Sequence, residues 1–168
     1  MALPRALALT PDELDELMRS AWVMRIATIG PGTRLHVTPM WFGWAGGRIY
    51  LTGRGQKVVN LRRDPVCTVI VDRNERFPEL QAAMFQGHAS VLEDAAAEAA
   101  DPHLEEARWQ IGTKYHGGHG ERAEPLAPGE RHRNDATARG RNRRWIVVVP
   151  ERTVTWDNFK LDRVRASG

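Results

Sequence analysis

Three strand-like segments follow one another early in the chain, and only short turns separate them. They are residues 23–29, 35–44 and 49–52. A parallel connection between neighbouring strands needs a crossover of a dozen or more residues, usually a helix, and neither linker has room for one. Gly46-Gly47 in the second linker is typical of a tight hairpin turn. The three segments are therefore predicted to pair antiparallel.

The second of these segments carries a proline, Pro39. Proline has no backbone N–H to donate to a neighbouring strand, so within sheets it is confined to edge strands and bulges. We therefore expect residues 35–44 to form an edge strand or to bulge at Pro39.

Three more strands are predicted downstream. Residues 66–71 form an almost wholly apolar run, which is typical of a strand buried on both faces. Residues 80–92 form a long strand with Gly87 as a bend or bulge, and residues 145–156 form a last strand broken at Pro150. Six strands in antiparallel linkage favour a mainly β fold, a small barrel rather than a doubly wound sheet.

Few helices are expected. Thr10-Pro11 followed by two acidic residues is a typical helix start, because threonine caps the helix and acids lie at its positive end. A short helix is predicted for residues 56–63, and two more are predicted between residues 93 and 115. Helices at these positions would lie at the periphery of a barrel.

The chain of 168 residues is predicted to form a single domain, 1–168, with a mobile basic loop at 117–144. Residues 131–144 contain six arginines and one aspartate, a local balance of +5, whereas the formal charge of the whole chain is +3. No aromatic residues alternate with these arginines, so no nucleic-acid partner is predicted. A solvated loop, or a loop that closes over an anionic ligand, is favoured.

Cys67 is the only cysteine, and it lies inside the apolar run of residues 66–71. A disulfide framework is therefore excluded, and a cytoplasmic location fits best. A buried strand residue is favoured over a catalytic nucleophile. No apolar run approaches the length that spans a membrane, so no membrane partner is predicted.

Arg54-Gly55-Gln56-Lys57 is the segment best suited to bind an anion. Glycine allows close approach of the backbone, a helix start offers unpaired N–H groups, and Lys57 adds a positive charge, a combination that suits phosphate. His116 and His119 have no helix to hold both rings on one face and no carboxylate or cysteine at metal spacing, so no metal is predicted. No Gly-x-Ser-x-Gly or Walker motif is present.

An ordered series of motifs resembles the pyridoxamine 5′-phosphate oxidase-like flavin and deazaflavin-dependent oxidoreductases, the FMN-binding split β-barrel family. The series is Val-Thr-Pro-Met-Trp-Phe at 37–42, the Gly-Gly hairpin, Lys-x-x-Asn-Leu-Arg-Arg-Asp-Pro at 57–65, Phe-x-Gly-x-Ala at 85–89 and Trp-Asp-x-x-Lys-Leu at 156–161. The resemblance covers roughly residues 10–100 and 143–162. It implies a six-stranded antiparallel Greek-key split barrel.

The resemblance also implies a homodimer with cofactor sites at the interface. The strand at 38–41 would lie along the cofactor ring, the segment 52–60 would hold its phosphate, and the partner subunit would contribute two residues near the C-terminus. The cofactor-binding residues expected on this basis are Thr38, Pro39, Met40, Trp41, Thr52, Gln56, Lys57, Asn60, Trp156 and Lys160.

Within the family, Trp41-Phe42 and the form of the Lys57 motif look more like the actinobacterial branch that uses the deazaflavin coenzyme F-420. The implied reaction is hydride transfer between F-420 and a small conjugated organic acceptor, with the chemistry carried by the cofactor. His36 and Arg25 are the candidates for assisting protonation. The alternatives are an FMN-binding oxidoreductase of the same fold and a non-catalytic module that binds a cofactor or a tetrapyrrole.

Overall fold

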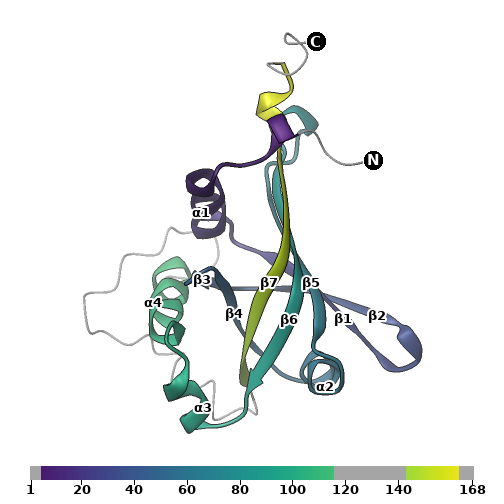
Figure 1. Ribbon diagram of the computed structural model, residues 1–168, viewed down its shortest axis with the longest axis vertical. Coiled ribbons are helices and arrows are strands. Elements are labelled where there is room, and N and C mark those ends of the chain that lie inside the picture. Colours follow the sequence, from purple (N-terminus) through teal and green to yellow (C-terminus); the bar gives the residue numbers. More distant parts are fainter. Residues whose placement is uncertain (1–4, 116–142, 163–168) are drawn as a thin grey trace.

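The computed structural model describes residues 5–115 and 143–162, and within them an antiparallel sheet of seven strands curls into an open barrel (Figure 1). The strands are β1 Met24–Ile29, β2 Leu35–Met40, β3 Gly43–Ala45, β4 Arg48–Gly53, β5 Val66–Arg73, β6 Gln81–Leu92 and β7 Arg144–Asp157. The helices are α1 Pro11–Ser20, α2 Gln56–Arg63, α3 Ala95–Ala100 and α4 Leu104–Tyr115, with short 3-10 turns at Arg5–Leu7, Pro31–Thr33, Phe77–Glu79 and Asn158–Lys160.

The strand order explains why the sheet curls. It is β2-β1-β5-β6-β7-β4-β3, so the two edge strands follow each other in the chain, separated only by Trp41 and Phe42. Both edges must therefore approach each other, and the sheet rolls until they do. The predicted mainly β antiparallel split barrel is confirmed, and Pro39 lies on an edge strand, as its missing N–H requires.

The strand count differs from the prediction, because residues 35–44 form two strands. β2 pairs with β1 at one edge of the sheet, and β3 pairs with β4 at the other. At the break, side chains of α4 replace the strand ladder as partners of the backbone. Phe42 N donates to Tyr115 Oη at 3.2 Å, and Trp44 N donates to Gln110 Oε1 at 2.9 Å.

Gly87 produces the predicted bulge, since the register between β6 and β7 shifts between Gln86 and Gly87. A Cβ atom at this position would lie 2.1 Å from the carbonyl oxygen of Val149. The predicted break at Pro150 is wrong. β7 runs on through Pro150, which lies opposite Gly87 where the bulge already interrupts the ladder.

The barrel interior is filled from the strands and closed by two helices. Thr10 caps α1, accepting from Glu13 N at 3.3 Å, and α1 buries Leu17 and Met18 in the core. α2 contributes Val58 and Leu61 to the same core. β5 is the third of the seven strands, and Cys67 on it is buried, as predicted. The predicted burial of both faces is wrong, because buried residues alternate along β5 with residues that are exposed or half-buried.

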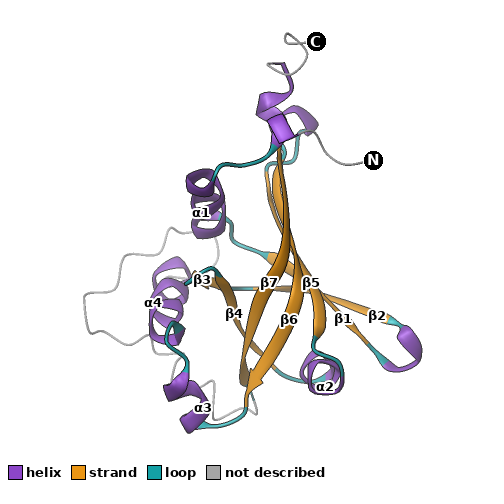
Figure 2. Ribbon diagram, in the orientation of Figure 1, coloured by secondary structure: helices purple, strands orange, loops and turns teal. Residues whose placement is uncertain are grey.

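α4 covers only part of the outside of the barrel. It packs against β3, and a second apolar cluster forms there from Ala45, Tyr50, Leu104, Ala107, Trp145 and Val147. Figure 2 shows α3 and α4 on the β3–β4 side, away from β1 and β2. None of the helices in residues 5–115 and 143–162 combines the length and apolarity needed to cross a bilayer.

Candidate functional site

An open seam runs along the barrel where its two edges meet. β3 pairs with β4 only over Arg48–Tyr50, so the second half of β4 has no partner on that side among the described strands. The outer edge of β2 likewise has no partner strand in the described part of the chain. A cavity of about 450 Å³ lies in this seam. The curled topology therefore leaves a cavity between two strand edges that have no partner among the described strands.

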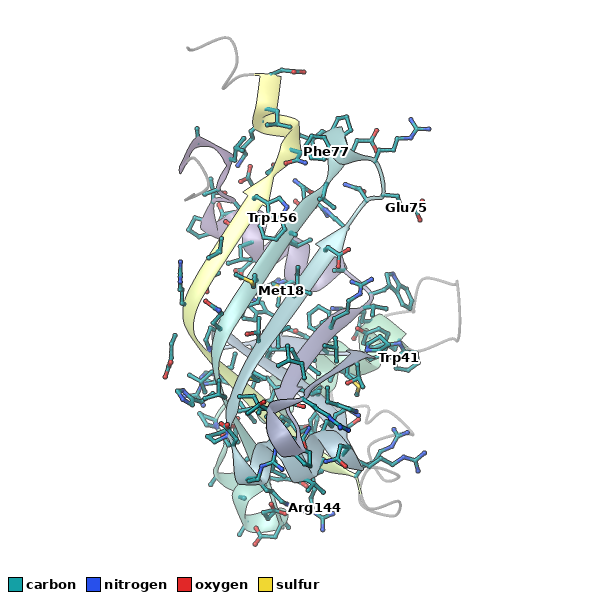
Figure 3. The ribbon with its side chains drawn as sticks, turned by 90° about the vertical axis from the view of Figure 1, so that its right-hand side faces the viewer. Met18, Trp41, Glu75, Phe77, Arg144 and Trp156 are labelled. Atoms are coloured by element: carbon teal, nitrogen blue, oxygen red, sulfur yellow. The ribbon has the colours of Figure 1, made fainter. Side chains whose placement is uncertain are left out.

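The cavity is lined from both sides of the seam. β2 and the residue after it supply Pro39, Met40 and Trp41, and β4 supplies Thr52 and Gly53. Val23 precedes β1 and lines the cavity as well. These β2 and β4 residues belong to the segments 38–41 and 52–60, for which the family resemblance implies contacts with the cofactor ring and with its phosphate; that role stays a prediction. Figure 3 shows Trp41 on the side of the curled sheet that carries β2.

Three cations converge at one end of the cavity: Arg54, Lys57 and Arg143. The pKa of Lys57 is lowered from its usual value, first because the side chain is partly buried and then because Arg143 and Arg54 add positive charge nearby. None of the described residues that line the cavity is acidic. Among the described residues, the cluster therefore has no acidic partner in the cavity lining and is suited to an anionic ligand.

The backbone around Lys57 is shaped to support this role. Gly55 caps α2 with a φ of 71° and no side-chain hydrogen bond, so the start of the helix stays open. A Cβ atom at Gly53 would lie 3.2 Å from Lys57 Cδ and 2.6 Å from Ile146 Cδ1. Gly53 therefore leaves room for the lysine stem beside the barrel core. An open helix N-terminus next to a lysine favours phosphate.

Two buried polar atoms on β2 lack partners. His36 Nδ1 and Thr38 Oγ1 are both inaccessible to solvent and make no hydrogen bond with the residues that the structure describes. Both lie on the same face of β2 as Met40, because side chains two residues apart share a face. Unpaired buried polar atoms are costly, so this strand fits a ligand that supplies hydrogen-bonding groups.

Two expected phosphate contacts have other partners within this chain. Asn60 is fully buried, and its Nδ2 donates to Thr28 Oγ1 at 3.0 Å, which ties α2 to β1. Gln56 Nε2 donates to Asn60 Oδ1 at 2.8 Å. Neither residue is among those that line the cavity. Their described contacts thus hold α2, and with it Lys57, against the barrel.

Arg25, Trp156 and Lys160 are not among the residues that line the cavity. Arg25 forms an ion pair with Asp72 on the outer face of the sheet. Lys160 Nζ donates to Ala8 O at 2.8 Å and to Glu13 Oε2 at 2.5 Å. Figure 3 shows Trp156 near the far end of β7 from Arg144, which adjoins the cavity residue Arg143. A role for Trp156 and Lys160 in a partner's site stays a prediction.

Sequence reasoning did not single out Arg143 as a site residue. Its place beside the cavity follows only from the strand order, because Gly53 at the end of β4 pairs with Arg144 at the start of β7. Val23, just before β1, was also missed, whereas Gly53 lies inside the segment 52–60 that the family resemblance assigns to the phosphate. The candidate metal ligands His116 and His119 lie outside the described residues. Within residues 5–115 and 143–162, no three His, Cys, Asp or Glu side chains gather closely enough to hold a metal ion.

Lys114 is an unusual buried cation near the end of α4. Its Nζ donates to Met18 O at 2.9 Å and to Ala21 O at 3.1 Å, and it lies 4.0 Å from the centre of the Phe42 ring. Burial lowers the pKa of Lys114 to about 7. The ammonium therefore fastens α4 to the segment before β1, at an energetic cost that depends on pH.

That cost predicts a pH dependence of stability. Because the pKa of Lys114 is lower in the folded chain than in the unfolded chain, the folded state binds fewer protons above pH 7, and stability should rise with pH. Lys114→Met should lack this rise, so the stability of the natural chain relative to the variant should increase by up to about 1.4 kcal/mol per pH unit. Urea unfolding of both proteins at pH 7, 8 and 9 measures the difference. A constant difference would contradict the prediction.

A family model described as pyridoxamine 5′-phosphate oxidase matches residues 10–138 of the chain. No curated protein matches it. Among solved structures, the conserved hypothetical protein Rv2991 from Mycobacterium tuberculosis superposes with a TM-score of 0.74 at 24% identity, covering 96% of this chain and 93% of that one.

Two other solved structures share the fold at lower identity. A FAD-binding protein from Mesorhizobium loti has a TM-score of 0.60 at 19% identity and covers 88% of this chain and 94% of its own. HutZ, the heme storage protein from Vibrio cholerae, has a TM-score of 0.62 at 14% identity and covers 87% of this chain and 94% of its own. At these identities the likeness concerns the fold.

Proposed function

The chain belongs to the pyridoxamine 5′-phosphate oxidase family, and on that premise we propose that it is a flavin- or deazaflavin-dependent oxidoreductase. The form proposed first transfers a hydride between coenzyme F-420 and a small conjugated organic acceptor. The observation that carries the proposal is the seam cavity of about 450 Å³, where Arg54, Lys57 and Arg143 form a cationic end and none of the described lining residues is acidic.

The residues around the cavity fit a molecule with a flat ring and an anionic tail. The cations suit a phosphate. His36 and Thr38 are not among the residues that line the cavity, but they lie on the same strand, and their buried polar atoms make no hydrogen bond with the described residues. Pro39 and Met40 offer apolar surface to the ring itself. The cluster of three positive charges supports a ligand with more than one anionic group, which favours F-420 over FMN.

When bound, such a cofactor supplies the hydride chemistry. The protein's part is to bind, orient and exclude water. Lys57 and the two arginines would hold the anionic end, and the edge of β2 would fix the ring in the seam. Pro39 and Met40 would shield that ring from water on one side, and Trp41 would border it. His36 is the candidate for moving a proton, since its buried Nδ1 makes no hydrogen bond with the described residues.

A second copy of the chain is proposed to complete the site. Part of the outer face of β2 is apolar and exposed, with 74% of Leu35 and 58% of Val37 accessible to solvent. The register aligns these two residues with Ile29 and Ala27 of β1 on the same outer face. A partner that covers this face would bring a second set of residues near the seam, Trp156 and Lys160 among them in the family arrangement. A cytoplasmic location is proposed with it, since Cys67 is buried and unpaired.

Titration of the purified chain with F-420 and with FMN tests the proposal. Saturable quenching of F-420 fluorescence, followed by transfer of hydride from reduced F-420 to menadione, is the expected result. Tight FMN binding with flavin-dependent turnover would instead favour the FMN alternative. Haem binding without hydride transfer from either cofactor would favour the non-catalytic module. The similarity in fold to the heme storage protein supports this alternative.

A further inference from the structure

Tyr115, the last residue of α4, joins two segments that border the cavity. Its ring is buried, and its hydroxyl donates to Trp22 O at 2.8 Å. The same oxygen accepts from Phe42 N at 3.2 Å. Trp22 precedes β1 and Phe42 lies between β2 and β3, so the phenol links the two chain segments at the end of the seam.

The ring of Tyr115 also packs against the indole of Trp41. The two rings are stacked, with their centres 4.5 Å apart and their planes within 3° of parallel. The ring of Trp22 meets Tyr115 edge-on at 5.5 Å. Trp41 lines the cavity and is 43% exposed, so one part of the indole lies against Tyr115 and another part faces the ligand space.

An exposed tryptophan on a loop would ordinarily sample several rotamers, and binding a ligand would have to select one of them. A parallel aromatic contact holds the indole in one orientation before any ligand arrives. Tyr115 is itself fixed, because Lys114 beside it donates to Met18 O and Ala21 O. The stacked ring of Tyr115, 74 positions later in the chain, therefore restricts the orientation of Trp41.

We infer that Tyr115 is a positioning residue that holds Trp41 as a flat wall of the cavity, and that a planar conjugated acceptor binds by stacking on this wall. The inference deepens the proposed function by naming how the acceptor is recognised. Tyr115 acts through Trp41 and does not itself line the cavity. A planar quinone can stack on this wall, whereas a saturated acceptor of the same size gains no binding energy from stacking.

A double-mutant cycle on binding of menadione, a planar naphthoquinone, tests the inference. Equilibrium dialysis gives its Kd for the natural chain, Trp41→Leu, Tyr115→Met and the double variant. We expect about tenfold weaker binding for Trp41→Leu and about fivefold for Tyr115→Met. The double variant should bind no more weakly than Trp41→Leu alone, because Tyr115 acts only through the indole. Trp109→Leu, an exposed tryptophan on the same helix, serves as the control and should leave Kd unchanged.

Additive losses in the cycle would overturn the inference, as would a natural chain that does not bind menadione. If Tyr115→Met does not fold, the cycle is run with Tyr115→Phe, which retains the stacked ring. Its expected loss is about twofold, again absent in the Trp41→Leu background. Failure of the proposed function is recognised separately, since it appears as a natural chain that binds neither F-420 nor FMN while the menadione cycle still gives its result.

Discussion

Replacement of Lys57 by methionine should weaken the binding of F-420 or FMN about a hundredfold. A charged hydrogen bond to phosphate in a partly desolvated site contributes about 3 kcal/mol, which corresponds to two powers of ten in Kd. Arg54 and Arg143 remain in the variant, so binding should be weakened and not abolished. Fluorescence titration at fixed ionic strength measures the change.

The same substitution should not destabilise the free protein. Burial and the neighbouring arginines already lower the pKa of Lys57, so in the absence of an anion its charge opposes folding. Thermal unfolding of the ligand-free variant should occur at the same temperature as that of the natural chain or higher. Arg19→Met removes one charge from an exposed position on α1 and is the matched control. If Lys57→Met and Arg19→Met bind the cofactor equally well, the phosphate assignment is wrong.

Gly87→Ala should have the largest effect on stability of any single methyl group added to this fold. The new Cβ would lie 2.1 Å from Val149 O, and the backbone of Pro150 and Glu151 lies within 3.1 Å as well. Because these neighbours are backbone atoms of the adjoining strand, they cannot rotate away, and β6 and β7 must separate at their bulge. We expect a loss of about 4 kcal/mol in the free energy of unfolding, measured by urea titration.

Gly32→Ala separates this close contact from the general effect of replacing glycine. Gly32 has a φ of 63°, but a Cβ atom there would have no neighbour within 4 Å. Only the strain of the left-handed conformation remains, which costs about 1 kcal/mol. Equal losses for the two variants would show that the contact at Gly87 relaxes easily.

The features that the sequence predicted correctly depend on the chemistry of the residues at those positions. Pro39 cannot pair on both sides, so it requires an edge, and the structure places it there. Gly46-Gly47 permits a tight turn, with φ values of 55° and 71°, and Gly87 permits a bulge. Each of these outcomes follows from a missing N–H or a missing Cβ, which neighbours in sequence cannot change.

The features that the sequence did not predict depend on partners far along the chain. The strand break at Trp41 and Phe42 is stabilised by hydrogen bonds to side chains of α4, about seventy residues away. The residues around the break show no sequence pattern that predicts it. Arg143 reaches the cavity only because β7 pairs with β4. Asn60 matched a family motif, yet its described contacts are with Thr28 and Gln56 inside the protein. Local pattern predicted the strands that border the cavity, the family resemblance implied their place beside a cofactor, and tertiary pairing decided which other residues line the cavity.

The open seam has a further consequence, for self-association. An unpaired strand edge is a template on which another chain can add a strand, and edge-to-edge addition leads to aggregation. In this barrel the free edge of β2 and the free half of β4 both flank the same cavity. Pro39 and Met40 are the β2 residues that line this cavity, and Pro39 removes one donor from that edge. A ligand that fills the cavity would therefore cover the part of both edges that a foreign strand would need.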